Sequence, residues 1–302
     1  MSAFMSRSRG NQTVFLALAA ASLLIGWRAL FGTLALSWRN DEYTQILLIL
    51  PISMALILME RRSVRSVSDW NFGIGPALVA LAAAVACFTS FASRSLTPDV
   101  RLSAGMFALV LSWIGSFVLC FGKRASRSVL FPLLFLFGLI PLPDVALNFI
   151  IALLQKGSAW SAHALFALFG VPVLQQGVML TIPNLTIQVA QECSSIRSSS
   201  MLLITTMVLA QVLLRSPWRK ALIVALAIPL SVAKNGLRIF TIAMLGTRVD
   251  PGYLTGRLHH QGGILWFLLA LICIFAALAV CQRREGTRTA PDPKPETAAT
   301  GD

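Results

Sequence analysis

Eight apolar segments, most of them long and most separated by short polar stretches, constrain the fold of this 302-residue chain more than any other feature. A helix that crosses a membrane needs about 20 mostly apolar residues, because lipid offers no partner to an unpaired backbone amide. The segments therefore predict an all-α polytopic membrane protein with about eight transmembrane helices, of which the fifth is the shortest. They cover approximately Val14–Leu36, Tyr43–Met59, Ile74–Phe91, Leu102–Phe121, Val129–Ile140, Ser195–Leu214, Ala221–Leu245 and Gly262–Cys281.

The composition argues against a soluble enzyme and against a nucleic-acid-binding protein. Hydrophobic residues make up 56% of the chain and charged residues only 12%, about half the charged fraction of soluble domains. The net charge is +13, but the basic residues lie between the apolar segments rather than in one surface patch. The five cysteines have no CxxC spacing, so they suggest neither a disulfide framework nor a zinc site. We also expect no other metal and no cofactor.

The positions of the basic residues predict how the chain crosses the membrane, because short cytoplasmic loops are enriched in Lys and Arg. Fifteen of the 25 basic residues lie at one alternating set of span ends, beginning with Arg7 and Arg9, and six lie at the opposite set. We therefore expect both termini in the cytoplasm, with the first apolar segment retained as a helix rather than cleaved as a signal peptide. The other four lie inside spans or at their ends: Arg28, Arg197, Lys234 and Arg238.

One long interruption, residues 141–194, falls on the outer side in this topology. Its first part, Val145–Phe169, is apolar at helical spacing but carries polar side chains, which favours a helix in or partly entering the membrane interface, with a ninth crossing as the alternative. Its second part alternates apolar residues on both sides of Pro183 and Asn184, which predicts a small extracytoplasmic strand pair before the sixth span. Residues 1–284 are expected to form a single membrane domain, and residues 285–302 a disordered cytoplasmic tail.

Three polar clusters lie at the predicted outer ends of the last three spans. Ionisable groups inside a membrane are costly, so each cluster is a candidate functional site. The first contains QECSSIRSSS, the second KNGLRI and the third LHHQGG. Their candidate residues are Cys193, Ser194 and Arg197, then Lys234, Asn235 and Arg238, then His259 and His260.

Several of these residues also have a structural interpretation. Cys193 and Arg197 lie four residues apart, on one helical face, but Arg197 alone would be explained as an anchor at the lipid head groups. Arg238 lies roughly 10 Å below the outer end of its helix, and Asn235 shares its face, which favours a buried polar site. The adjacent histidines point in different directions, so they do not form a helical metal pair, and at most one is expected to face the site.

For the remaining residues a structural role explains the sequence as well as a catalytic or binding role, or better. Lys234 is explained as readily by structural pairing as by function. The serines around the first cluster are expected mainly to allow close helix packing, and His163 to pack at the membrane interface. The cysteines interpreted as small buried hydrophobic residues are Cys87, Cys120, Cys273 and Cys281.

A thiol, a guanidinium and an imidazole together support covalent acyl transfer. The nucleophile is the thiolate, which a neighbouring cation favours by lowering the pKa of the thiol. A permanently charged Arg stabilises the oxyanion formed when the thiolate attacks an amide carbonyl. A His then protonates the departing amine.

These residues resemble those of the exosortases and archaeosortases, multi-span membrane cysteine enzymes of envelope protein sorting. VAQECSSIRSS is similar to the family's cysteine motif, with Ser195 where the family most often has Gly. The family's NxxRI element matches Asn235–Ile239 and places its essential arginine at Arg238. Its histidine element matches LHHQGGILWF and places the family histidine at His259, with His260 as a neighbour. The resemblance covers about residues 40–270.

The resemblance implies a cysteine peptidase or transpeptidase that cleaves carboxy-terminal sorting signals of exported proteins, of the PEP-CTERM type in bacteria. Such a signal consists of a short motif, a transmembrane helix and a basic cluster. It would be cleaved through a thioester on Cys193, with Arg238 and His259 assisting and an amine or water as acceptor. The residues expected to bind substrate or to support catalysis are Arg197, Asn235, Ser194 and His260.

The same resemblance implies a location and partners. The enzyme is expected as a multi-pass protein of the bacterial cytoplasmic (inner) membrane, with its active site facing the extracytoplasmic side. Its expected partners are the sorting signal and membrane lipid, with no nucleic acid, and the sequence gives no prediction of oligomeric state.

Two other functions stay open at this level. A polytopic transporter would use Arg238 and Lys234 to line a pathway for an anionic ligand, but it gives no role to Cys193 or His259. A non-catalytic relative would bind sorting signals without cleaving them, and the complete set of cysteine, arginine and histidine argues against it.

Overall fold

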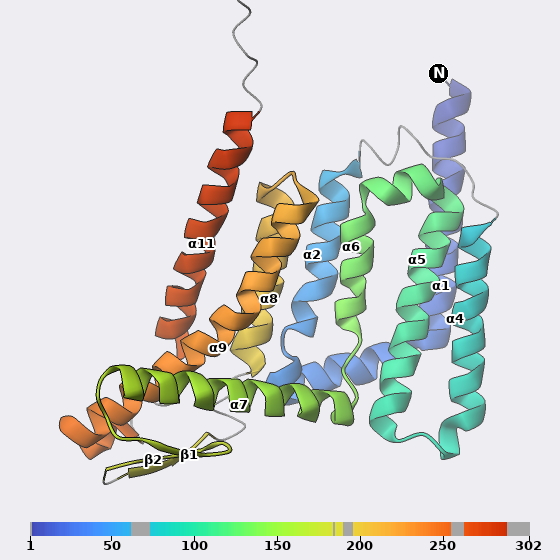
Figure 1. Cartoon of the computed structure of the whole chain (residues 1–302). Coiled ribbons are helices and arrows are strands. Elements are labelled where there is room, and N and C mark those ends of the chain that lie inside the picture. The colour runs from blue at the N-terminus through green and yellow to red at the C-terminus, as the bar shows by residue number, and fades with distance from the viewer. Residues whose placement is uncertain (1, 62–72, 184, 190–195, 255–262, 289–302) are drawn as a thin grey trace, which may run out of the picture. The chain divides into compact units, whose positions relative to one another are not determined.

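The computed structural model describes residues 2–61, 73–183, 185–189, 196–254 and 263–288 (Figure 1). Among these residues, seven helices are long and apolar enough to cross a membrane, and a bent helix pair raises the number of candidate spans to as many as eight. The predicted class, an all-α polytopic membrane protein, is therefore confirmed. The chain divides into two compact units, Met1–Ile151 and Ala152–Asp302, with the boundary inside helix α7 (Asp144–Leu168). The expected single membrane domain over residues 1–284 stays a prediction.

The first unit is built around helix α5, the most buried of the candidate spans. Helices α1 and α4 pack on α5, and α2 packs on α6 and on the 3-10 segment that follows α6. The bounds are α1 (Ser2–Arg39), α2 (Ile46–Met59), α4 (Ile74–Phe91), α5 (Pro98–Ser128) and α6 (Leu130–Phe135), with 3-10 segments at Asp41–Tyr43, Ala92–Arg94 and Leu136–Leu139.

Glycines allow α4 and α5 to approach each other closely. A Cβ on Gly75 would lie 2.5 Å from the Cα of Leu119, and a Cβ on Gly115 would lie 2.9 Å from the backbone nitrogen of Val79. Small residues at such contacts are the usual basis of helix packing in membranes, where burial in lipid gives no hydrophobic gain. Near its end α5 bends at Gly122, whose φ of 80° is a conformation that glycine adopts without strain (Figure 1).

The fifth predicted span is half as long as a spanning helix. Residues Leu130–Leu139 are helical, about 15 Å at 1.5 Å per residue, and the chain then bends by 99° into α7. The sequence signal for this break is Pro141 and Pro143, which lack the amide hydrogens that a continuing helix needs. The predicted helix over Val145–Phe169 is thus present as α7, while its position in the membrane interface stays a prediction.

Three side chains hold the turn before α7. The hydroxyl of Tyr43 donates to the carbonyl of Leu142 at 2.9 Å, and the hydroxyl of Ser103 donates to the carbonyl of Pro141 at 2.7 Å. The carboxylate of Asp99 accepts the first backbone N–H of α7 at 3.0 Å. A carboxylate at this end of a helix satisfies one of the unpaired amides and opposes the positive end of the helix dipole.

The second unit contains the rest of α7, a small sheet and three long helices. The bounds are β1 (Leu174–Gln176), β2 (Met179–Ile182), β3 (Leu185–Gln188), α8 (Ile196–Leu213), α9 (Pro217–Arg248), a 3-10 segment at Pro251–Leu254, and α11 (Gly263–Arg288). Helix α11 continues past the boundary expected for the tail, so Glu285 is helical.

The sheet has one strand more than the sequence predicted. The expected pair is present as β2 and β3, which are antiparallel with Leu180 opposite Ile187, and β1 joins β2 on its other side. The turn from β1 to β2 contains Gly177 at φ 62°, a conformation favourable for glycine in a two-residue hairpin. The sequence feature that could have indicated this turn is Gly177 directly after Gln175 and Gln176.

Two apolar clusters organise the second unit. One joins α7, the sheet and the later part of α9, and its fully buried members include Phe166 and Leu180. The other joins α8, the earlier part of α9 and α11, and includes Leu202 and Ile274. Helix α9 takes part in both clusters, and its polar residues lie where it passes from one to the other.

Candidate functional site

The polar clusters predicted from the sequence are described in part. Arg197, Asn235 and Arg238 lie in α8 and α9 and are described. Cys193, Ser194, His259 and His260 lie outside the described residues.

Hydrogen bonds between polar side chains join the start of α8 to the middle of α9. The ammonium of Lys234 donates to the hydroxyl of Ser198, and the hydroxyl of Ser231 donates to the hydroxyl of Ser199 at 2.5 Å. Lys234 is only 6% exposed and Ser231 only 4%. The serines expected mainly to permit close packing therefore also supply hydrogen-bond partners, and Lys234 has the structural pairing that the sequence left open.

These bonds set how α8 and α9 are aligned. The two helices are consecutive and antiparallel, so positions further along α9 lie opposite positions earlier in α8 or before it. Arg238 follows Lys234 by four residues, one helical turn further in that direction on the same face. Arg238 is half-buried, whereas Arg197, in the first turn of α8, is exposed.

Asn235 connects α9 to α7. Its amide nitrogen donates to the hydroxyl of Ser158 at 2.8 Å, and both residues are 1% exposed. Its carbonyl oxygen Oδ1 is also buried and has no hydrogen-bond partner among the described residues. An unpaired buried acceptor lowers the stability of the folded protein. An apolar side chain would avoid this cost at position 235.

Helices α7 and α9 come close because small residues face each other where they cross. A Cβ on Gly236 would lie 2.5 Å from the Cβ of Ser161 and 2.9 Å from the backbone nitrogen of Ala162. A Cβ on Gly157 would lie 3.1 Å from a methyl carbon of Val232. This close crossing allows the short hydrogen bond between Asn235 and Ser158.

The chain is fixed on both sides of the segment that carries Cys193. Before it, Val189 is 1% exposed, its N–H donates to Val178, and its carbonyl accepts the side-chain amide of Gln155 on α7 at 3.2 Å. After it, the chain continues directly into α8 at Ile196. Both attachment points lie in the second unit, against α7 and α9.

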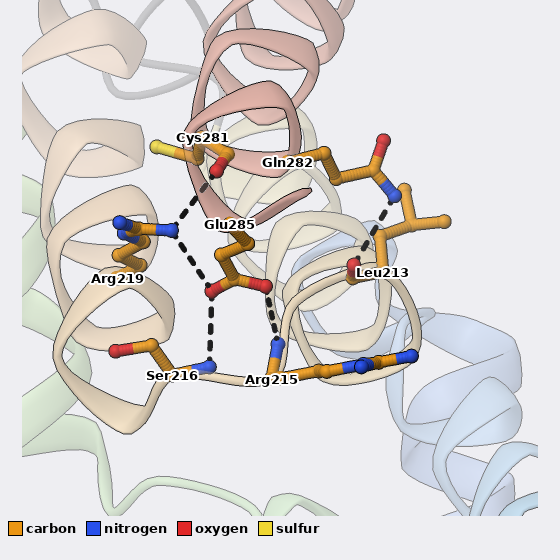
Figure 2. Close-up of polar contacts among 7 residues, drawn as sticks. All are labelled: Leu213, Arg215, Ser216, Arg219, Cys281, Gln282 and Glu285. Carbon is orange, nitrogen blue, oxygen red and sulfur yellow. Dashed lines mark hydrogen bonds and ion pairs between the residues drawn. The ribbon is translucent and has the colours of Figure 1, made fainter. Parts of the chain in front are cut away.

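The opposite end of the α8–α9 pair is tied to α11 by Glu285 (Figure 2). Its carboxylate accepts the backbone N–H groups of Arg215 and Ser216, each at 3.0 Å, and lies 3.4 Å from the guanidinium of Arg219. Arg219 also donates to the carbonyl of Cys281 at 3.2 Å. We call Glu285, Arg219 and the turn at Arg215 and Ser216 the α11 clamp.

The sequence did not predict the α11 clamp, because Glu285 stood at the start of the expected tail. The sequence feature that could have indicated the clamp is an acidic residue just after the last apolar segment. In the predicted topology this residue lies on the same side of the membrane as the basic turn between α8 and α9. The clamp fixes α11, whose first residue Gly263 follows the two histidines closely in the chain.

The other cysteines do not form a site. Cys87, Cys120, Cys273 and Cys281 are free thiols. Only Cys120 is buried, whereas Cys87 and Cys273 are exposed, which corrects the expectation that all four are buried. Exposed cysteines suit spanning helices because the surface that faces lipid is itself apolar. No group of three or more metal-binding side chains occurs among the described residues.

His163 on α7 also has no identified function. Its Nδ1 atom is buried and has no hydrogen-bond partner within the described part of the chain. The side chain is half-buried, and its packing at the membrane interface stays a prediction.

The fold and the polar contacts define a multi-pass membrane protein with a polar centre among its last helices. Residues 37–276 match the family described as transmembrane exosortase (Exosortase_EpsH). The chain therefore belongs to the transmembrane exosortase family, a family of sorting-related membrane enzymes. No curated protein and no solved structure matches the chain.

Proposed function

We propose that this protein is a cysteine transpeptidase or peptidase that cleaves carboxy-terminal sorting signals, with Cys193 as the nucleophile and Arg238 and His259 as its partners. Membership of the exosortase family carries the proposal, since the matched residues 37–276 include all three of these positions. The arrangement of α8 and α9 supports it independently.

Chain length supports a meeting of Cys193 and Arg238. A chain extends at most about 3.6 Å per residue, so the Cα of Cys193 lies within about 11 Å of that of Ile196 at the start of α8. The bonds from Ser198 and Ser199 align the first turn of α8 with α9 at Ser231 and Lys234, one helical turn before Arg238, and Cys193 precedes that first turn in the chain. No other arginine of α9 occupies this level of the helix pair.

The position of Cys193 also favours its thiolate form. A cation close to a cysteine in the sequence lowers the pKa of the thiol and so favours the thiolate. Arg197, in the first turn of α8, adds a positive charge. We assign Arg197 and Ser194 to support of the nucleophile, Asn235 to the positioning of α9, and His260 to the surroundings of His259.

The proposed reaction proceeds in two steps. The Cys193 thiolate attacks the carbonyl carbon of the scissile amide, and the guanidinium of Arg238 stabilises the resulting oxyanion. The carbon–nitrogen bond then breaks, His259 donates a proton to the departing amine, and a thioester remains on Cys193. In the second step an acceptor amine or water gives a proton to His259, attacks the thioester carbonyl carbon and releases the thiolate of Cys193.

We further propose the substrate and the place of the reaction. The substrate is an exported protein whose carboxy-terminal signal has a short motif, a transmembrane helix and a basic cluster. The enzyme lies in the bacterial inner membrane with both termini in the cytoplasm and its site on the extracytoplasmic side. The distribution of Lys and Arg supports this orientation.

The test is to express the protein with a signal-bearing substrate and to follow its processing by mass. We expect Cys193→Ala to abolish processing and Cys87→Ala, at an exposed cysteine of α4, to leave it unchanged. A covalent adduct trapped on Cys193 during turnover would support the thioester. Normal processing by Cys193→Ala would refute the proposal.

The transporter alternative receives less support from the contacts. Lys234 is buried and its ammonium is bonded to Ser198, as expected for a structural lysine rather than one that lines an open pathway.

A further inference from the structure

A second candidate site lies in the first unit, between α1, α4 and α5. These helices surround a cavity of about 910 Å³. Small residues such as Gly26, Gly105, Ala83 and Ala86 form much of its wall. Ala83 and Ser90 on this wall are exposed, so the cavity is accessible from outside the helices.

One end of the cavity is basic. Arg28 on α1 and Arg101 on α5 both line it. Helices α1 and α5 are antiparallel, and a Cβ on Gly105 would lie 3.2 Å from the Cβ of Ala29, so the two arginines belong to the same end of the helix pair. Both side chains are exposed.

At the basic end of the cavity, the hydroxyl groups of α4 already donate to backbone carbonyls, so the two arginines are the donors available to a ligand. Thr89 and Ser90, near the end of α4, also line the cavity. Each donates its hydroxyl proton to the carbonyl of Ala86, both at 2.9 Å. Their oxygen atoms can still accept, but the positive charge at this end comes from Arg28 and Arg101.

Neither arginine has an acidic partner in the described part of the chain. The guanidinium of Arg28 lies 5.8 Å from the centre of the Trp27 ring, a contact that leaves its charge uncompensated. Arg28 also precedes the end of α1 at Arg39 by eleven residues, about 16 Å along the helix axis. A cation at such a position in a membrane requires a counter-charge or a path to water.

The mainly apolar wall of the cavity and its basic end together favour an anionic lipid as its occupant. An acyl chain needs only a narrow apolar channel, which the alanines and glycines provide. A phosphate matches the two guanidinium groups, because Arg binds phosphate through paired hydrogen bonds.

We propose that this cavity binds an anionic phospholipid, with its acyl chain between α1, α4 and α5 and its phosphate at Arg28 and Arg101. This site is separate from the proposed cysteine chemistry and does not depend on it. Each basic residue near an anionic head group contributes about fivefold to lipid affinity, so the pair contributes about 30-fold.

The experiment measures lipid bound to the purified full-length protein by native mass spectrometry. The protein is reconstituted with either phosphatidylglycerol or phosphatidylcholine. We expect phosphatidylglycerol to be retained preferentially, and the double variant Arg28→Gln, Arg101→Gln to lose about 30-fold in its affinity. Arg94→Gln, at an exposed arginine of the neighbouring 3-10 segment that does not line the cavity, is the matched control and should retain the lipid.

A second pair of variants tests the apolar part. Ala83→Leu narrows the cavity and should reduce retention, whereas Ala84→Leu, at an exposed alanine of the same helix outside the cavity, should not. Equal retention of both lipids, or normal binding by the double arginine variant, would overturn the proposal. Competition by glycerol phosphate as effective as that by the intact lipid would do the same, as would retention of an apolar helical peptide in place of the lipid.

Discussion

Lys234 and Arg238 lie one helical turn apart on α9, but the structure gives them different surroundings. The ammonium of Lys234 is bonded to Ser198 inside the helix pair, whereas Arg238 is less buried and lies one turn nearer the attachment of the Cys193 segment. A lysine provides a compact point charge, and an arginine provides a planar set of donors. The contacts therefore assign Lys234 to helix pairing, and Arg238 stays the arginine of α9 that we propose for the chemistry.

Replacing Arg238 by Lys should impair the reaction although the charge is retained. A point ammonium lacks the planar fork of donors, and loss of one oxyanion donor typically costs about 10²-fold or more in rate. The measurement is the rate of substrate processing at equal amounts of membrane-inserted protein. Near-normal turnover would mean that Arg238 is structural.

The two adjacent histidines should differ in importance. His259→Ala should reduce the rate of processing by about 10²-fold or more, the usual contribution of a general acid, while His260→Ala should have a much smaller effect. The same processing assay applied to both variants makes each the control for the other. A larger effect at His260 would assign the catalytic role to that residue instead.

At the scale of elements, the crossing of α7 over α9 explains how a polar centre is held among apolar helices. Gly236 lets the helices approach, and Asn235 beside it bonds Ser158 across the contact. Ser198 and Ser199 bond α9 from the other helix, α8. Helix α9 is thus fixed on two sides at the level just before Arg238.

Gly236→Ala should destabilise this crossing. The added Cβ would meet backbone and side-chain atoms of α7 at 2.5–2.9 Å, and overpacking of this kind typically costs about 1–3 kcal/mol. The thermal unfolding midpoint in detergent should fall, and processing should fall with it. Gly10→Ala in α1, where an added Cβ meets nothing within 4 Å, is the control and should leave the midpoint unchanged or slightly raised. Equal midpoints for the two variants would show that α7 and α9 can separate without cost.

The α11 clamp is the second contact between elements with a testable consequence. Glu285→Ala removes the acceptor for two backbone N–H groups and the partner of Arg219 (Figure 2). We expect a lower thermal midpoint, by a few degrees, because these amides lose the carboxylate that satisfies them. Glu60→Ala, at an exposed glutamate, should have no such effect. An unchanged midpoint in Glu285→Ala would mean that water replaces the carboxylate without loss.

For the whole molecule, the distribution of basic residues predicts which helix ends face the cytoplasm. In a variant without native cysteines, Asp250→Cys after α9 should react with a membrane-impermeant maleimide from outside the inner membrane. Ser128→Cys, at the end of α5, should react only after the membrane is permeabilised. Both positions are exposed, so a difference in labelling reports topology. Labelling of Ser128→Cys alone from outside would reverse the proposed orientation.

The sequence was sufficient for the class of protein, for most of the span limits and for the family. In lipid the backbone can form hydrogen bonds only within its own helix. Each spanning helix is therefore recognisable from a local apolar run, such as Ile74–Phe91, whose bounds agree with α4. The strand pair around Pro183 was equally local. The cysteine, arginine and histidine motifs were recognisable because their spacing lies within short segments.

Only the tertiary structure decided which polar residues meet. Ser198 and Lys234 are separated by 36 positions, Ser158 and Asn235 by 77, and the Glu285 carboxylate accepts an amide 70 positions away. The sequence assigned Ser198 to packing and Glu285 to a tail, because each has ordinary neighbours along the chain. Their partners follow from how glycines let whole helices approach, and such contacts depend on the geometry of packed elements rather than on any local pattern of residues.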